Sequence, residues 1–189
     1  MLTTPLVFKN VQVLELASVL AGPAVGQFFA ELGADVVKVE SPNSGDVTRS
    51  WKISGEEAKV SAYFSSVNWG KRSIGLDLKV DKDRELLQKL IAKAHIIITS
   101  FRPGTDKALK LDYASVRIYN PGIIYGQITG YGPTSNRVGY DAVLQAESGF
   151  MYLNGHPDHG PQKMPVALID ILAAHQLKEA LLVAWIRRI

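Results

Sequence analysis

The stretch VQVLELASVLAGPAVGQFFAELGADVVKVE, residues 11–40, decides the fold. Its opening segment, residues 11–17, is rich in β-branched and aliphatic side chains, which is typical of a buried strand. Residues 21–33 follow as a helix, with Pro23 suited to its first turn. Residues 34–40 then predict a second strand. A strand, a helix and a strand of these lengths form a βαβ unit, and the two strands of such a unit run parallel.

The same alternation continues along the chain. Further strands are expected at 73–79, 95–100 and 122–129, with an amphipathic helix at 81–94 and a short helix at 113–120. This order predicts an α/β fold built on a doubly wound, mostly parallel, Rossmann-like sheet. Sheets of this kind bind ligands beyond the carboxyl ends of their strands. The Gly-, Pro- and Ser-rich loops at those ends are therefore candidate binding segments, at residues 18–23, 41–51, 100–107 and 130–141.

Composition narrows the class of protein. The 189 residues are 47% hydrophobic and 21% charged, with a net charge of only +3 and scattered Lys and Arg residues, which argues against a nucleic-acid partner. The absence of cysteine excludes disulfides, a thiol nucleophile and thiolate metal ligands. No secretory signal is visible, and no apolar run approaches the ~20 residues that a membrane helix requires. A cytoplasmic protein without a membrane partner is expected.

Glu40 at the end of the second strand invites a nicotinamide or flavin cofactor, because an acid there binds the ribose in dinucleotide-binding folds. That reading needs the pattern G-x-G-x-x-G at the first turn, where glycines let the backbone approach the pyrophosphate. The chain offers Gly22, Pro23 and Gly26 instead, with the wrong spacing and a proline among them. A dinucleotide cofactor is therefore disfavoured, and the GxxxxGK[ST] motif of a P-loop is absent.

Asp170 is a single carboxylate in an otherwise apolar run, PVALIDILAAH, residues 165–175. A buried carboxylate without a partner costs several kcal/mol, so a chain retains one for a reason. Two reasons are open from the residues alone. Asp170 is either an N-cap of the helix that follows it or a group with a chemical role.

Four blocks of the sequence together resemble the family III CoA-transferases, also called the CaiB/BaiF family, which includes formyl-CoA and carnitine CoA-transferases. The blocks are VLELASVLAGPAVGQFFAELGADVVKVESPNSGDVTR (13–49), VNWGKRSIGLDLK (67–79), GYGPTSNRVGYDAVLQAESGFM (130–151) and PVALIDILAA (165–174). They occur in the family's order, and within the family they are most similar to members that move CoA between dicarboxylates such as succinate and glutarate.

The resemblance implies a nucleophile. Family members use one aspartate in a block that matches VALID, which makes Asp170 its counterpart. The substrates implied are coenzyme A, carried as an acyl-CoA, and a small carboxylic acid, with aspartyl anhydride and aspartyl-CoA thioester intermediates and no metal. The family's racemases carry a histidine at the position of Tyr140. Because a tyrosine is a poor base at neutral pH, transfer is favoured over racemisation. Tyr140 is expected either to orient the substrate or donate a hydrogen bond to it, or to pack its ring under the loop.

The resemblance also implies contacts with CoA. Leu20 and Ala21 match positions near the pantetheine arm or the adenine, and they differ from the Gln-Ser pair of the formate-using members. The other implied contacts are Leu76 to Lys79 for the adenosine and Ser100, Phe101 and Arg102 for the phosphates, with Lys107, Lys71 and Arg72 as further cationic candidates. His156 and His159 share one loop, but without a third ligand they are expected to be solvated rather than metal-bound.

Members of this family are roughly twice as long as this chain, and their subunits interlock as homodimers. Residues 1–189 are expected to be the N-terminal part of the large domain, without the small domain and the C-terminal return. The final helix, with Leu177, Leu181 and Trp185 at helical spacing, would then have an uncovered apolar face. The chain alone is expected to have little or no transferase activity. A non-catalytic CoA-binding or assembly module, and a racemase, are the alternatives.

Overall fold

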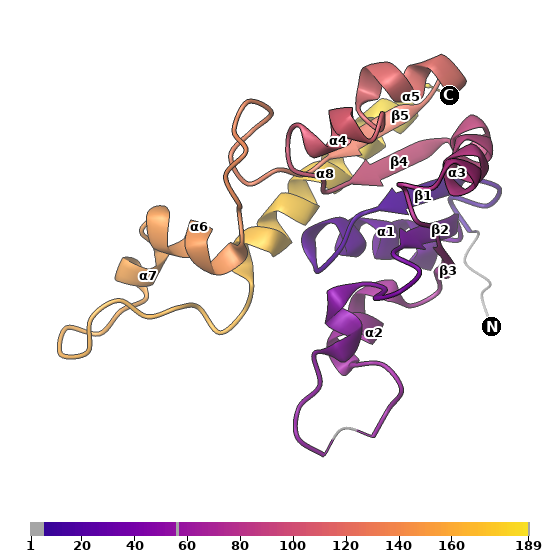
Figure 1. Cartoon of the computed structure of the whole chain (residues 1–189). Coiled ribbons are helices and arrows are strands. Elements are labelled where there is room, and N and C mark those ends of the chain that lie inside the picture. The colour runs from indigo at the N-terminus through magenta and orange to yellow at the C-terminus, as the bar shows by residue number, and fades with distance from the viewer. Residues whose placement is uncertain (1–5, 56, 189) are drawn as a thin grey trace.

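A five-stranded parallel sheet forms the centre of the computed structural model, which describes residues 6–55 and 57–188 (Figure 1). Its strands are β1 (Gln12–Leu16), β2 (Asp35–Glu40), β3 (Arg72–Gly75), β4 (Ile96–Thr99) and β5 (Ile124–Gln127). Their spatial order is β3-β2-β1-β4-β5, and every neighbouring pair is parallel. The predicted doubly wound α/β fold is confirmed.

Helices cover both faces of the sheet, because successive residues of its strands point to opposite sides. Val13, Ile96 and Ile98 pack in one apolar cluster with α1 (Ala21–Glu31) and α8 (Leu168–Ile186). Leu14 and Ile97, their neighbours in sequence, pack in the other cluster with α3 (Asp81–Lys93) and α5 (Tyr113–Tyr119). The strands therefore read as continuous apolar runs, as expected for a parallel sheet buried on both faces.

Short helical segments outside the predicted pattern shape the loops. They are η1 (Val47–Ser50), α2 (Ala62–Asn68), α4 (Thr105–Ala108), α6 (Asp141–Glu147) and α7 (Phe150–Leu153). Figure 1 shows α6 and α7 projecting away from the sheet, joined to it through the first turn of α8. This arrangement brings residues after β5 back towards the loops that follow β1 and β4.

Two predicted elements differ from the structure. The strand expected at 73–79 ends at Gly75, after which the chain turns, with the Leu76 N–H still bonded to the Glu40 carbonyl. The last helix begins at Leu168, before Asp170 rather than after it, and its apolar face is covered. Leu181 is 2% exposed and packs with α1, so the expectation of an uncovered face is wrong.

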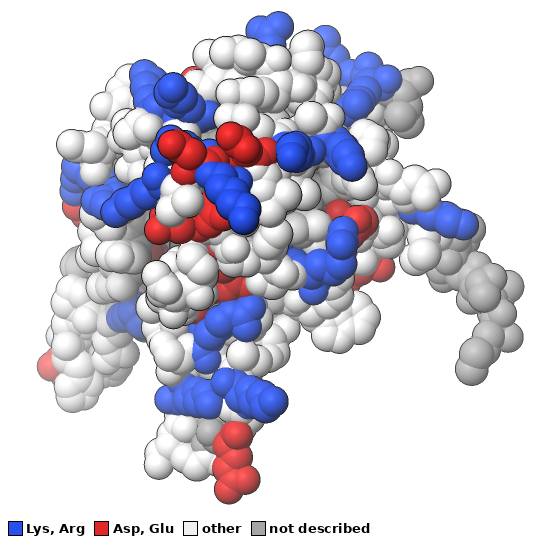
Figure 2. All heavy atoms as spheres, turned by 45° about the vertical axis from the view of Figure 1, so that its right-hand side comes forward, with Lys and Arg blue, Asp and Glu red and all other residues white. Residues whose placement is uncertain are grey.

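Charged side chains are mixed on the surface. On the face drawn in Figure 2, Lys and Arg lie among Asp and Glu rather than in one continuous basic patch. Within the described residues, no helix is both long and apolar enough to cross a bilayer. The same residues bring together no group of three or more His, Asp or Glu side chains that could hold a metal ion.

Candidate active site

Two adjoining clefts lie at the carboxyl ends of the strands. The first, the Leu76 cleft, has a volume of about 510 Å³ and is lined by the ends of β1 and β2 and by residues 76–79. The second, the Asp170 cleft, has a volume of about 650 Å³ and reaches from the loop after β1 to the start of α8. Ser18, Ser100 and Phe101 line both clefts. The junction is held together by the Ser18 N–H, which donates to Ser100 Oγ at 3.2 Å.

Asp170 lies in the first turn of α8, and its half-buried carboxylate lines the Asp170 cleft. The N-cap of α8 is Ala167, so the interpretation of Asp170 as an N-cap is wrong. The segment before the helix is irregular. Within residues 6–55 and 57–188, no donor bonds to the Asp170 carboxylate, which leaves both of its oxygens available to a ligand.

The pKa of Asp170 reflects burial and a like charge. Burial, followed by the negative charge of Asp141, raises the pKa of Asp170 to about 6 from its ordinary 3.8. The dipole of α8 acts in the opposite direction, because an anion in the first turn of a helix is stabilised. Burial and the Asp141 charge outweigh it. At neutral pH the group is still mostly ionised, as a nucleophile must be, but it is a stronger base than an ordinary aspartate.

Asp141, which sequence reasoning missed, positions this turn. Its Oδ1 accepts the N–H of Ile169 at 2.9 Å and the N–H of Asp170 at 3.4 Å, so it satisfies the free amides at the start of α8. Its Oδ2 accepts from the Gln145 side-chain amide at 2.6 Å. Gln145 is fully buried and also bonds to the segment before α8, accepting the Met164 N–H. The available signal was the acid after Tyr140 in the GYD block.

Most of the sequence-predicted CoA contacts lie along the two clefts. Leu76 and Lys79 line the Leu76 cleft, and Ser100 and Phe101 lie at the junction. The predicted residues that line the Asp170 cleft are Ala21, Ser100, Phe101, Arg102 and Tyr140. Leu20 and Lys107 line neither cleft: Leu20 is the N-cap of α1, and Lys107 is exposed on α4.

Two of the cationic candidates are committed elsewhere. Lys71 is buried, and its Nζ donates to Glu15 Oε2 at 2.7 Å, with burial lowering its pKa to about 8 despite the Glu15 charge. Arg72 pairs with Asp35 at the amino end of β3, away from the clefts. The hypothesis that these two residues bind phosphate is therefore not supported by their positions.

The structure adds residues that sequence reasoning did not place at the site. Tyr63 from α2 lines the Asp170 cleft, and its pKa is raised by burial and then by the nearby carboxylates, Asp170 first among them. Trp51 packs edge-on against Tyr63, with ring centroids 5.3 Å apart. Arg137 and Lys163 also line this cleft. Their basic side chains could have been found only by knowing that residues from 137 to 163 lie near the loops that follow β1 and β4.

The histidines lie away from Asp170. His156 and His159 are in a short hairpin closed by a bridge between His156 and Gly160, and His156 is well exposed. His95 Nδ1 accepts the Gln12 N–H, and its ring packs on Trp185. His175 is exposed on α8. None of the histidines lines the described part of the Asp170 cleft.

The fold and the site together define the class of protein: an α/β protein with an accessible carboxylate in one of two adjoining clefts. The family model described as CoA-transferase family III matches residues 8–189, so this chain belongs to that family. The resemblance seen in the four sequence blocks is thereby confirmed.

Individual relatives agree with this assignment. The chain is 43% identical over 172 residues to the succinate–glutarate CoA-transferase of Agrobacterium fabrum, covering 86% of this chain and 43% of that protein. It is 39% identical over 168 residues to the human succinyl-CoA:glutarate CoA-transferase, covering 86% of this chain and 38% of that protein. A CaiB/BaiF family protein from Brucella suis superposes with a TM-score of 0.88 at 44% identity, covering 98% of this chain and 50% of that one. The chain thus spans half or less of these proteins' lengths.

Proposed function

We propose that this chain provides the nucleophile and much of the CoA cleft of a CoA-transferase that acts on an acyl-CoA and a small carboxylic acid. The observation that carries the proposal is Asp170, whose unpartnered carboxylate lies in a cleft that adjoins a second cleft at the junction of Ser18 and Ser100. An extended ligand such as an acyl-CoA fits such a pair. The nucleotide would occupy the Leu76 cleft, and the thioester would reach Asp170.

The proposed reaction begins when an Asp170 oxygen attacks the thioester carbonyl carbon. The C–S bond breaks, CoA leaves as a thiolate, and a mixed anhydride remains on Asp170. The thiolate attacks the aspartyl carbonyl and releases the donor acid, which leaves an aspartyl-CoA thioester. The acceptor carboxylate then attacks that carbonyl and again expels the thiolate. Attack of the thiolate on the acceptor's acyl carbon gives the new acyl-CoA and frees Asp170.

A dicarboxylate is the proposed acid, because the relatives named above are transferases of succinate and glutarate. Arg102 and Lys163 give the Asp170 cleft the positive charge that phosphates or a distal carboxylate need, whereas Arg137, which also lines the cleft, is paired with Glu147. Coenzyme A enters as a substrate, and no metal takes part in the proposed reaction. We also propose that the protein acts in the cytoplasm, and that the whole protein is a homodimer, as family members are.

Racemisation is the less favoured reaction. It needs a second acid or base beside Asp170, and the described Asp170 cleft has no histidine for that role. Tyr140 is 66% exposed and lines this cleft, and a tyrosine is in general a poor base at neutral pH. We propose that Tyr140 orients the substrate.

Trapping the acyl-enzyme tests the proposal. After incubation with succinyl-CoA, hydroxylamine should convert an anhydride or thioester on Asp170 into a hydroxamate that peptide mass spectrometry locates. Asp170→Asn is the control, and a modification that persists in this variant would place the nucleophile elsewhere. CoA binding by calorimetry without any trapping would favour the non-catalytic CoA-binding module.

We further propose that residues 1–189 form the N-terminal part of the large domain and have little or no transferase activity by themselves, since they span less than half of the curated relatives. The chain should therefore show trapping but little net transfer when it is mixed with succinyl-CoA and a panel of carboxylic acids. Robust turnover by the isolated chain would contradict this view.

A further inference from the structure

The loop between β1 and α1 has an unusual backbone. Val19 has φ +70, a left-handed conformation that a β-branched residue rarely adopts. The loop is also the part of the chain at the centre of the site: Val19 lines the Asp170 cleft, and its neighbour Ser18 lines both clefts. Strained conformations of this kind persist only where the surrounding structure holds them.

Three hydrogen bonds hold this loop. Lys38 Nζ donates to the Ala17 carbonyl at 2.6 Å, before the bend. The Val19 N–H donates to Asp46 Oδ2 at 3.2 Å, at the bend itself. After the bend, Lys71 Nζ donates to the Pro23 carbonyl at 2.8 Å. The loop is therefore bound at both ends and in the middle by groups from β2, the segment after β2, and the segment before β3.

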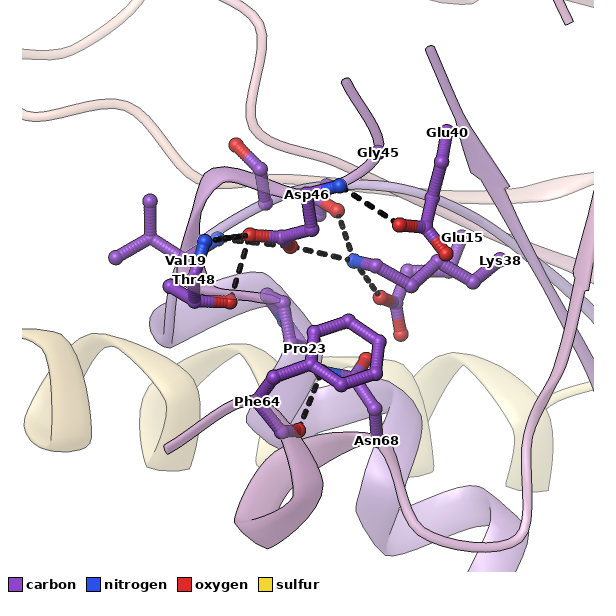
Figure 3. Close-up of polar contacts among 12 residues, drawn as sticks. Glu15, Val19, Pro23, Lys38, Glu40, Gly45, Asp46, Thr48, Phe64 and Asn68 are labelled. Carbon is purple, nitrogen blue, oxygen red and sulfur yellow. Dashed lines mark hydrogen bonds and ion pairs between the residues drawn. The ribbon is translucent and has the colours of Figure 1, made fainter. Parts of the chain in front are cut away.

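These groups form one buried ionic network, which we call the loop clamp: Glu15, Lys38, Asp46 and Lys71. Lys38 Nζ lies 2.9 Å from Glu15 Oε1 and 3.0 Å from Asp46 Oδ2, with the Lys38 side chain 1% exposed (Figure 3). The other oxygen of Glu15, Oε2, pairs with Lys71 Nζ. Opposite charges in hydrogen-bond contact hold their partners in fixed positions, because leaving any one of them unpaired in the interior is strongly unfavourable.

We propose that Asp46 and Lys38 are positioning residues for the acyl-CoA. By holding Val19 in its strained conformation, they fix the junction through which the pantetheine arm would pass towards Asp170. This proposal rests on the proposed function, and it assigns the loop clamp a role in substrate placement. The clamp touches neither the thioester nor the nucleophile, so its effect is on geometry and not on the chemical step itself.

The test uses variants that separate placement from folding. Asp46→Ala removes the acceptor for the Val19 N–H, whereas Asp46→Asn keeps an acceptor oxygen there. Val19→Gly added to Asp46→Ala relieves the strain, because glycine adopts φ +70 freely. Thr48→Val is the matched control: it removes the Thr48 hydroxyl bond to Asp46 Oδ1 of 2.7 Å and leaves Val19 bound.

We expect Asp46→Ala to weaken CoA binding and to slow Asp170 trapping at saturating succinyl-CoA, each about tenfold, and to speed hydrogen exchange at the Val19 amide. Asp46→Asn, and Val19→Gly in the Asp46→Ala background, should recover part of both losses. Thr48→Val should lower the melting temperature but leave CoA affinity and trapping within about twofold. Should Asp46→Ala fail to fold, Asp46→Asn and the double variant carry the comparison.

A loss of affinity and trapping in Thr48→Val equal to that in Asp46→Ala, with no recovery by Val19→Gly, would overturn the proposal in favour of a purely structural clamp. Failure of the proposed function looks different. If the wild-type chain binds CoA without being trapped, the transferase proposal fails, while the tenfold change in CoA affinity still tests the clamp. A wild-type chain that does not bind CoA overturns both.

Discussion

At the scale of single residues, Asp170 and Asp141 show how one carboxylate serves another. Asp141 accepts hydrogen bonds from the amides that begin α8 and so holds the backbone of the turn that carries Asp170. Its charge also makes Asp170 harder to ionise, in the same sense as burial. Position and basicity are therefore set by one neighbour, and the two effects can be separated by changing the charge of that neighbour while keeping its oxygen.

The pH dependence of trapping follows from this arrangement. Because only the carboxylate attacks, the rate of Asp170 trapping should rise with pH and reach half its maximum near pH 6, where the pKa of Asp170 lies. Asp141→Asn keeps an acceptor for the two amides but removes the charge, so the midpoint should move to lower pH. A midpoint unchanged by Asp141→Asn would show that the Asp141 charge does not reach Asp170.

The free energy of unfolding should depend on pH in the opposite direction. A folded-state pKa raised from 3.8 to about 6 means that the native state loses stability as the pH rises through this window. Asp170→Asn should therefore raise the free energy of unfolding by about 1 kcal/mol at pH 7, after allowance for the partial exposure of the group. Urea unfolding at pH 7 and below pH 4 measures this. The gain should vanish at the lower pH, and a gain that persists there would have another cause.

At the scale of elements, β1 and α1 meet at a position where only glycine fits. A Cβ on Gly26 would lie 1.9 Å from Glu15 Oε2, the oxygen that binds Lys71. Close packing of the helix on the strand and the buried ion pair therefore depend on the same missing side chain. Gly26, which does not fit a dinucleotide motif, therefore has a packing role.

Gly26→Ala should destabilise the protein by at least about 2 kcal/mol, because Glu15 must move and leave Lys71 partly unpaired. The control is Gly122→Ala, where the nearest atoms to an added Cβ are 3.9 Å away. Thermal unfolding of both variants measures the difference. Equal melting temperatures for the two would mean that Glu15 repacks freely.

Helix α8 makes the contact that the sequence did not suggest. Leu181→Ala should lower the free energy of unfolding by about 2–5 kcal/mol, since Leu181 is 2% exposed against α1. Leu172→Ala, on the same helix at 47% exposure, should cost much less. Denaturant unfolding compares them. A small loss for Leu181→Ala would mean that α8 is only loosely docked.

Local patterns were enough to predict the sheet, because each βαβ step is written in consecutive residues. Contacts between segments that are distant in the sequence could not be predicted from local patterns. The start of α8 depends on Asp141, which binds the Ile169 amide from 28 residues earlier in the chain. Buried Lys71 pairs with Glu15, which lies 56 residues before it. In a sequence, a lysine or an aspartate on the surface cannot be distinguished from one in a buried ionic network. Asp170 was found because its apolar neighbours and its family block both marked it.

At the scale of the whole molecule, the proposed placement of CoA along the two clefts can be tested by removing positive charges from each cleft. Lys79 lines the Leu76 cleft and Arg102 lines the Asp170 cleft, and both residues are exposed. Replacing either with Ala should weaken CoA binding about three- to tenfold, and should reduce the dependence of binding on salt, since each removes a cation that can pair with phosphate.

Calorimetry at two salt concentrations measures both effects. Lys93→Ala is the control, because Lys93 ends α3, the helix that leads into the amino end of β4, and it is exposed away from the clefts. An equal effect of Lys93→Ala would indicate attraction by net charge alone.

The loop clamp also constrains how this chain can diverge. One carboxylate, Glu15, serves both Lys38 and Lys71, and Gly26 leaves the room that it occupies. Losing any one of these residues leaves a buried charge or a clash, so single substitutions there are poorly tolerated while joint replacement by apolar residues need not be. In related sequences, positions 15, 26, 38 and 71 should accordingly covary as a set. Such covariation would conserve the conformation of the β1–α1 loop, and with it the shape of the proposed substrate junction, in relatives that exchange different acids.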